Sequence, residues 1–165
     1  MDFKCTWESP LGPMILLSDG SSLRALWFAG QKYIDDKALA AAQEAPDRPE
    51  LKRGVQWLRD YFAGRQPSPF SVSMAPQGSD FRMKVWRLLL NIPYGSVTSY
   101  GALAGEFEKA WGKRVSAQAI GGAVGHNPLS ILIPCHRVLG STGALTGYAG
   151  GLDKKEALLK LEGAR

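Results

Sequence analysis

The sequence has few of the side chains that build metal sites and disulfide frameworks. Its 165 residues include only two cysteines and two histidines, and no CxxC or HxxxH spacing occurs, so a structural metal is not expected. Two cysteines, Cys5 and Cys135, make no disulfide framework, which predicts a reducing compartment, the cytoplasm or a nucleus. The chain also lacks an apolar run of the roughly 20 residues that span a bilayer, and its amino terminus lacks a secretory signal pattern. These absences predict a soluble protein that does not contact a membrane.

Acidic residues are scarce only in the second half of the chain. Residues 1–78 contain nine Lys and Arg and nine Asp and Glu, whereas residues 79–165 contain eleven and six. The whole net charge of +5 therefore belongs to the second half. This asymmetry suggests a module that faces a polyanion, joined to a neutral one. An ordinary basic surface would produce the same count.

The first half has the pattern of a small α/β domain, expected to span residues 1–75. Two apolar strands around Asp19-Gly20 indicate a β-hairpin. Residues 37–45 are a helix candidate. Residues 49–64 are a stronger one, because Pro49 fits a first turn and an apolar stripe follows it. The Pro-, Ser- and Gly-rich residues 64–80 predict a connector with a short strand inside it.

The second half, residues 76–165, predicts a series of helices. Ser79, Ser99 and Ser116 each fit the N-cap position of a helix. The third of these helices ends at Asn127-Pro128 and is rich in Ala and Gly. A helix, a turn and a small-residue helix in a basic context are typical of a helix-turn-helix. A plain αα-hairpin has the same pattern, so the motif alone leaves both possibilities open.

The segment "SILIPCHRVLG", residues 130–140, carries the residues best suited to chemistry. The apolar run predicts a buried strand that Pro134 ends, which places Cys135 at a strand-to-turn corner. A free thiol is mostly protonated at neutral pH, and a nearby imidazole such as His136 would raise the thiolate fraction. The positive charge of Arg137 would act in the same direction. A buried structural cysteine with an incidental histidine is the alternative, since free Cys is commonly buried.

Longer stretches around this segment resemble a known family. "PCHRV" is similar to the acceptor motif of the O6-alkylguanine-DNA alkyltransferases, the methylated-DNA–protein-cysteine methyltransferases. "FRMKVWRLLLNIPYGSVTSYGALA" resembles their first DNA-binding helices, and residues 119–163 resemble their recognition helix, active-site loop and closing helix. "SPLGPMILLSDGSSLRALWF" is similar to bacterial members. The resemblance implies a small ribonuclease H-like α/β domain followed by a mainly helical, winged-helix-like DNA-binding domain.

The same resemblance implies DNA repair by direct transfer of an alkyl group to the protein. The expected partner is double-stranded DNA that contains O6-alkylguanine, with O4-alkylthymine as a further substrate. The damaged base is flipped out of the duplex, because its target atom lies inside it. The product thioether is stable, so each protein molecule reacts once. No cofactor or metal is implied, and the protein is expected to act as a monomer.

Five residues match the family's reacting groups. By resemblance, Cys135 is the nucleophile, His136 is the base acting through water, and Glu162 orients the histidine. Asn127 braces the loop between the recognition helix and the nucleophile. Tyr100 donates a hydrogen bond to a ring nitrogen of the leaving guanine. Without the resemblance, Glu162 would be interpreted as a solvated helix end and Tyr100 as a half-buried core aromatic residue.

Further residues match the family's base pocket and DNA-contacting helix. Tyr148 and Ala149 fall in the pocket wall, where Ala149 would offer its backbone N–H to the guanine oxygen. Val138 would offer its backbone carbonyl to the guanine amino group. The remaining candidates for substrate or DNA contact are Arg114, Ser116, Ala117, Gln118 and Arg137.

Two features depart from the family pattern. Gln118 occupies the position at which the family inserts an arginine into the base stack, and a glutamine carries no charge and stacks more weakly. The segment between Tyr100 and Gln118 is several residues longer than expected and brings Lys113 and Arg114 into the turn. We hypothesise that Arg114 restores part of the lost affinity for DNA.

Two other functions are compatible with part of the pattern. A damage-sensing DNA-binding protein would keep the helix-turn-helix and the pocket, and Gln118 favours it, but relatives of that kind replace the acceptor cysteine. A cysteine hydrolase would use Cys135 and His136, yet no motif of that class is present and the basic second half would have no role.

Overall fold

The computed structural model describes residues 1–165. The chain forms two compact units, one of Met1–Gln77 with Pro128–Leu132 and the other of Gly78–Asn127 with Ile133–Arg165. No helix combines the length and the apolar character needed to cross a membrane.

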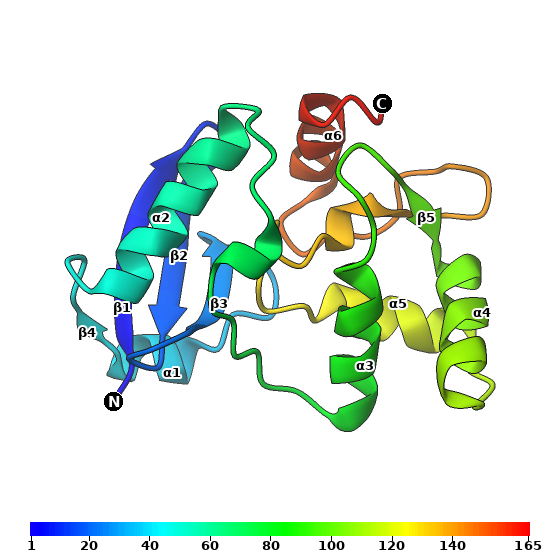
Figure 1. The fold of residues 1–165 in the computed structure, drawn as a ribbon, viewed down its shortest axis with the longest axis horizontal. Coiled ribbons are helices and arrows are strands. Elements are labelled where there is room, and N and C mark those ends of the chain that lie inside the picture. The colour runs from blue at the N-terminus through cyan, green and yellow to red at the C-terminus, as the bar shows by residue number, and fades with distance from the viewer. The chain divides into compact units, whose positions relative to one another are not determined.

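The amino-terminal unit is built on a four-stranded sheet with the order β3-β2-β1-β4 (Figure 1). Its strands are β1 (Phe3–Ser9), β2 (Gly12–Ser18), β3 (Leu23–Phe28) and β4 (Gln43–Glu44). The first three are antiparallel neighbours, and β4 runs parallel to β1. The predicted hairpin around Asp19-Gly20 is confirmed as β2–β3, and the Asp19 carboxylate accepts the backbone N–H groups of Ser21 and Ser22 in its turn. Strand β1 had no counterpart in the prediction.

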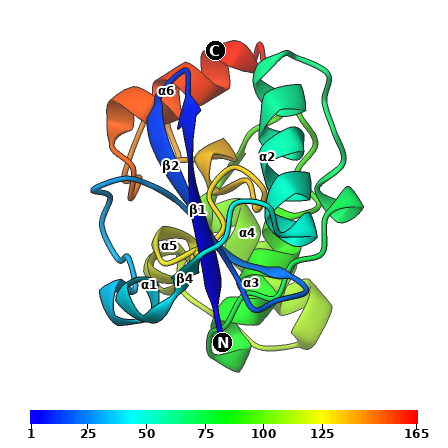
Figure 2. The same ribbon diagram turned by 90° about the vertical axis from the view of Figure 1, so that its left-hand side faces the viewer.

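Helices α1 (Asp36–Ala41) and α2 (Pro49–Phe62) cover opposite faces of this sheet (Figure 2). The face of the sheet that α1 covers carries the buried side chains of Leu17, Ala25 and Trp27. The helix predicted over residues 37–45 is too long, because Ala42 turns to an extended conformation. Beyond it, the N–H groups of Gln43 and Ala45 donate instead to the carbonyl oxygens of Asp2, just before β1, and Lys4.

Helix α2 agrees closely with the predicted helix over residues 49–64. Pro49 lies in its first turn, and the chain leaves it through Gly64 at a φ of 78°. Gly54 allows α2 to lie close to the sheet, since a Cβ there would stand 2.8 Å from Leu16 and 2.9 Å from Leu23.

Two segments outside the sheet strands complete the unit. The connector contains a 3₁₀ turn, η1 (Pro69–Ser71), and one isolated bridge from Met74 to Leu23. Residues 128–132 return from the second half of the chain, so that Leu26 donates its N–H to Pro128 and accepts the N–H of Ser130. The amino-terminal unit is therefore discontinuous in sequence.

The carboxy-terminal unit contains helices α3 (Asp80–Leu89), α4 (Tyr100–Trp111), α5 (Ala117–Gly125) and α6 (Leu152–Leu161). The predicted N-caps are confirmed, as the hydroxyls of Ser79, Ser99 and Ser116 each accept a first-turn N–H. A two-stranded parallel sheet joins β5 (Thr98–Ser99) to β6 (Val138–Leu139). This helical unit with a small sheet confirms the expected winged-helix-like class.

Aromatic residues hold the first three helices of this unit together. The Phe107 ring of α4 lies 5.2 Å from the Phe81 ring of α3, which joins the two helices, and 4.8 Å from Trp111 within α4. The indole of Trp86 donates to the carbonyl of Ala123 at 2.8 Å, which joins α3 to α5. The Ser116 cap fixes the start of α5, and the bond from Trp86 to Ala123 attaches α5 to α3. The first turn of α5 therefore has a defined position.

Candidate active site

Cys135 begins a short 3₁₀ helix, η2 (Cys135–Arg137), that is buried throughout. The N–H of Cys135 donates to the carbonyl of Ile133 at 2.7 Å. The predicted strand before it is wrong, although burial of the segment was predicted correctly. The segment forms only one isolated bridge, Leu129 to Leu26, and Ile131 adopts a left-handed φ of 70° that an extended strand does not allow.

Cys135 is buried, with 8% of the residue exposed, and its thiol lies near Asn127 and Lys155. Burial raises the pKa of this thiol, while a hydrogen bond from Asn127 and the positive charge of Lys155 oppose that increase. The Asn127 amide also donates to the carbonyl of Ile133 at 2.7 Å. Asn127, the last residue before Pro128, thus links the end of α5 to the cysteine turn.

His136 and Glu162 form a fully buried pair. The distance from His136 Nε2 to Glu162 Oε2 is 2.6 Å, and neither side chain has solvent-exposed area. Since a carboxylate only accepts, Nε2 carries the proton in this contact and Nδ1 keeps its lone pair. Burial lowers the pKa of His136, with Glu162 acting in the opposite direction. His136 is therefore a neutral imidazole whose Nδ1 is buried and has no hydrogen-bond partner.

Arg137 is the second partner of Glu162, and this differs from its expected role. Its Nε and Nη2 donate to the two carboxylate oxygens at 2.7 and 3.0 Å, and its Nη1 donates to the carbonyl of Ile92 at 2.7 Å. Arg137 was expected to contact substrate or DNA and to favour the Cys135 thiolate. It is instead buried and directed at Glu162, whose charge it neutralises.

Gly95 gives Glu162 a further donor. Its N–H lies 3.3 Å from Glu162 Oε1. Its φ is 80°, and a Cβ there would lie 3.1 Å from the backbone oxygen of Glu162, so glycine suits this position on both counts.

Lys155 is a site residue that the sequence reasoning missed. It is fully buried, and its ammonium donates to the carbonyls of Thr146 and Gly147 at 2.9 and 3.1 Å. Burial lowers its pKa to about 8, while the nearby Cys135 acts in the opposite direction. A sequence signal was present, because Lys155 lies on the face of α6 that also carries Leu158 and Glu162, at a spacing of three and seven residues.

Tyr100 joins the same group from the first turn of α4. Its hydroxyl donates to the carbonyl of Thr146 at 3.0 Å, and its ring lies 6.0 Å from the Lys155 ammonium. Burial raises the pKa of Tyr100. The structure therefore brings together Cys135, His136, Arg137, Glu162, Asn127, Tyr100 and Lys155.

The other residues predicted to bind the base or DNA lie in β6, in the loop before α6 and around the start of α5. Val138 is buried in β6, and Tyr148 and Ala149 are half-buried in the loop before α6. Arg114, Ser116, Ala117 and Gln118 are exposed at the start of α5 and in the turn before it. These four have no hydrogen bond to the buried group. No cluster of three or more metal-ligating side chains occurs.

Comparison with known proteins covers both units. The profile described as "6-O-methylguanine DNA methyltransferase, ribonuclease-like domain" matches residues 3–76, and the corresponding "DNA binding domain" profile matches residues 80–164. The methylated-DNA–protein-cysteine methyltransferase of Mycobacterium bovis is 42% identical over 160 residues, which are 97% of this chain and 92% of that one. Its counterpart in Methanosarcina acetivorans is 42% identical over 164 residues, 96% of each chain.

Solved structures agree with the sequence relatives. The Mycobacterium tuberculosis O6-methylguanine methyltransferase matches with a TM-score of 0.86 at 41% identity, covering 100% of this chain and 94% of that chain. The M. tuberculosis OGT in complex with DNA matches with a TM-score of 0.85 at 40% identity, covering 98% and 93%. With both halves matched by family profiles and close relatives along nearly its whole length, the chain belongs to the 6-O-methylguanine DNA methyltransferase family.

Proposed function

We propose that this protein repairs DNA by transferring the alkyl group of O6-alkylguanine, and of O4-alkylthymine, irreversibly to Cys135. The observation that carries the proposal is the buried Cys135–His136–Glu162 arrangement. Glu162 holds the proton of His136 on Nε2 and leaves the buried Nδ1 as a base. An activated nucleophile needs such a base, itself oriented by a third group.

The reaction is one displacement. The Cys135 thiol passes its proton through one water molecule to His136 Nδ1, and the thiolate attacks the alkyl carbon. A carbon–sulfur bond forms as the bond from that carbon to guanine O6 breaks, and the electron pair goes to the purine. Tyr100 donates its hydroxyl hydrogen to a ring nitrogen and stabilises the leaving guanine. Since no group reverses the thioether, one protein molecule removes one alkyl group.

The pocket for the flipped base lies along the loop of residues 140–151. In the free protein Tyr100 donates to Thr146, so guanine binding exchanges that carbonyl acceptor for a ring nitrogen. Lys155 keeps the Thr146 and Gly147 carbonyls of this loop in place. The backbones of Val138 and Ala149 serve the guanine amino group and oxygen, and Tyr148 forms a wall.

The start of α5 is the proposed DNA-contacting surface. Ser116 and Ala117 present the helix N-terminus, which favours phosphate groups. Gln118, exposed in the first turn, fills the space that the flipped base leaves in the stack, in place of the family's arginine. Arg114 is exposed and makes no ion pair within the protein, so it is available to a phosphate.

We also propose that the protein acts as a monomer in the cytoplasm. Both cysteines are free thiols, which fits a reducing compartment. The chemistry requires Cys135 as a thiol and uses groups from one chain alone.

Intact-protein mass spectrometry tests the function directly. After incubation with a duplex that contains O6-methylguanine, the protein should gain one methylene equivalent, mapped to Cys135 and absent in Cys135→Ser. A Cys5→Ser variant is the matched control and should react like the wild type. Binding to the lesion without any mass change would contradict alkyl transfer and would favour a damage sensor.

A further inference from the structure

The outer edge of β1 carries backbone groups that nothing in the chain pairs. On this side β4 matches only Phe3 and Lys4, after which Pro46 leads the chain away towards α2. The carbonyls of Asp2 and Lys4 point to this edge, since they accept the N–H groups of Gln43 and Ala45. Because strand residues alternate, the N–H and C=O groups of Thr6 and Glu8 point the same way. Both residues are exposed.

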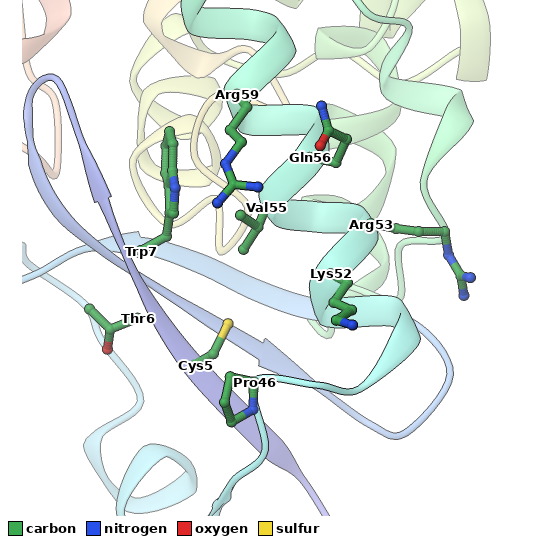
Figure 3. A pocket seen from close by; sticks show the side chains of 9 residues that line it. All are labelled: Cys5, Thr6, Trp7, Pro46, Lys52, Arg53, Val55, Gln56 and Arg59. Carbon is green, nitrogen blue, oxygen red and sulfur yellow. The ribbon is translucent and has the colours of Figure 1, made fainter.

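A cavity of about 540 Å³ lies beside this edge, between β1 and α2 (Figure 3). Cys5 and Trp7 project into it from β1, and Val55 and Arg59 face them from α2. The side chain of Thr6 points to the other side of the sheet. The volume lies within the range of about 300–1,000 Å³ that is usual for ligand pockets.

The cavity is basic and contains no acidic lining residue. Lys52, Arg53 and Arg59 line it, and none of their side chains forms an ion pair or hydrogen bond. The basic residues at the two ends of α2 differ, because Arg48 pairs with Glu50 and Arg65 with Asp60. The positive charge of the lining residues therefore has no acidic partner within the lining, and the carboxylate of Glu44 lies close enough to Cys5 to help raise the pKa of its thiol.

An unpaired strand edge beside a pocket is the arrangement used in β-strand addition, where backbone bonds supply affinity and the pocket supplies specificity. A guest strand beside Thr6 and Glu8 would place every second side chain against α2. Trp7 and Val55 offer that row apolar contact, and Lys52 and Arg59 offer it positive charge.

We propose that this edge binds an extended peptide segment of a protein partner, with acidic side chains at alternate positions that enter the cavity. The segment extends the sheet beyond Lys4, on the side where β4 ends. This site lies wholly in the amino-terminal unit and is separate from the alkyl-transfer function. It is measured without DNA, so the failure of either proposal leaves the other unaffected.

The test uses a fluorescein-labelled peptide of alternating Glu and Thr, which presents all its carboxylates on one face when extended. A peptide of the same composition with its Glu residues in one block is the control. Fluorescence anisotropy should show binding of the alternating peptide that weakens with salt. Lys52→Glu/Arg59→Glu replaces two attractions with two repulsions. Each exposed pair is weak by itself, but the combined change should weaken binding by about tenfold or more. Lys37→Glu with Lys32→Glu, an equal change of charge outside the cavity, should not.

N-methylated peptides separate strand addition from simple charge attraction. In an edge-bound strand only alternate N–H groups face β1, so methylation of one set, either the Glu or the Thr amides, should abolish binding while methylation of the other set is tolerated. Bound peptide should also slow hydrogen exchange at the amides of Thr6 and Glu8. Thr6→Pro, a substitution that edge strands tolerate, should prevent binding.

Three outcomes would overturn the proposal. One is the absence of binding, and another is equal binding of both methylated peptides, which would indicate charge attraction without strand pairing. The third is self-association of the free protein that Thr6→Pro abolishes, because the edge would then be occupied by a second copy of this chain.

Discussion

Glu162→Gln is the substitution that most directly tests how the site works. The change keeps the side chain's size but removes the charge that faces His136 and Arg137. It also replaces one acceptor oxygen with an NH₂ group, so at least one of the three donors now within 3.0 Å meets another donor. Arg137 keeps its positive charge in a buried position, without a counter-ion.

The magnitudes follow from this geometry. Breaking a buried charge pair by removing one partner costs about 3–5 kcal/mol in free energy of unfolding. His136 loses the partner that fixes its tautomer, and general-base assistance typically contributes about 10²–10⁴-fold to a rate. We therefore expect both a large loss of stability and a fall of about 10²-fold or more in the rate of alkyl transfer.

Urea unfolding and single-turnover transfer from an O6-methylguanine duplex measure the two effects separately. Glu156→Gln, an exposed carboxylate on the same helix, is the control and should change stability by less than about 0.5 kcal/mol. Arg137→Met/Glu162→Gln should recover much of the stability, since no charge is left unpaired, without recovering the rate. Wild-type speed in Glu162→Gln, or a stability loss below about 1 kcal/mol, would refute the reasoning.

The pH dependence of stability has a defined sign. Burial lowers the pKa of His136 from its usual 6.5, so below that pH the unfolded chain binds a proton that the folded protein does not. The free energy of unfolding should therefore fall as the pH drops below about 6.5, as proton linkage requires. Glu162 raises the pKa of His136, so in Glu162→Gln this loss should extend to lower pH. A His136 contribution that grows on acidification would contradict the assignment of a neutral imidazole.

Three further predictions concern other parts of the molecule. Lys155→Met should slow alkyl transfer most below pH 8, since the wild-type lysine has a pKa of about 8 and loses its charge above that value; a rate deficit independent of pH would indicate a packing role alone. Arg114→Ala should weaken DNA binding and lower the slope of log affinity against log salt by about one phosphate contact, whereas Lys37→Ala should leave that slope unchanged. Gly54→Ala should lower the free energy of unfolding by about 1–3 kcal/mol, because the added Cβ would lie under 3.0 Å from two buried leucines; calorimetry would show a lower Tm.

Local features of the fold were predictable from the sequence, and those that depend on distant partners were not. The caps at Ser79, Ser99 and Ser116 were predicted correctly because a hydroxyl and an N–H three residues on decide them. Residues 130–133 looked like a strand, but only Ser130 bonds to a strand residue, Leu26 of β3, and Ile131 has a positive φ. Gln43 left its predicted helix because the β1 edge offered it a partner.

For the candidate site, the identities of the reacting groups came from family resemblance, and their arrangement came from the structure. The sequence places Arg137 next to the nucleophile, yet the 3₁₀ turn directs its guanidinium to Glu162. Lys155 was missed because an adjacent lysine, Lys154, makes the pair look like a solvated surface. The helical spacing of Lys155 with Leu158 indicates a buried face, but neither contact is local, so no short-range pattern identifies the partners of Arg137 or Lys155.

The discontinuity of the amino-terminal unit has a consequence for synthesis on the ribosome. Leu26 of β3 obtains its outer hydrogen-bonding partners from Pro128 and Ser130, about a hundred residues later in the chain. During translation we therefore expect this edge of β3 to be paired only at Leu23, with the connector, and to stay unpaired at Leu26 while α3, α4 and α5 are made. Residues 128–132 are followed within three residues by Cys135. We therefore expect the first unit to be completed late in folding, by the same part of the chain that carries the nucleophile.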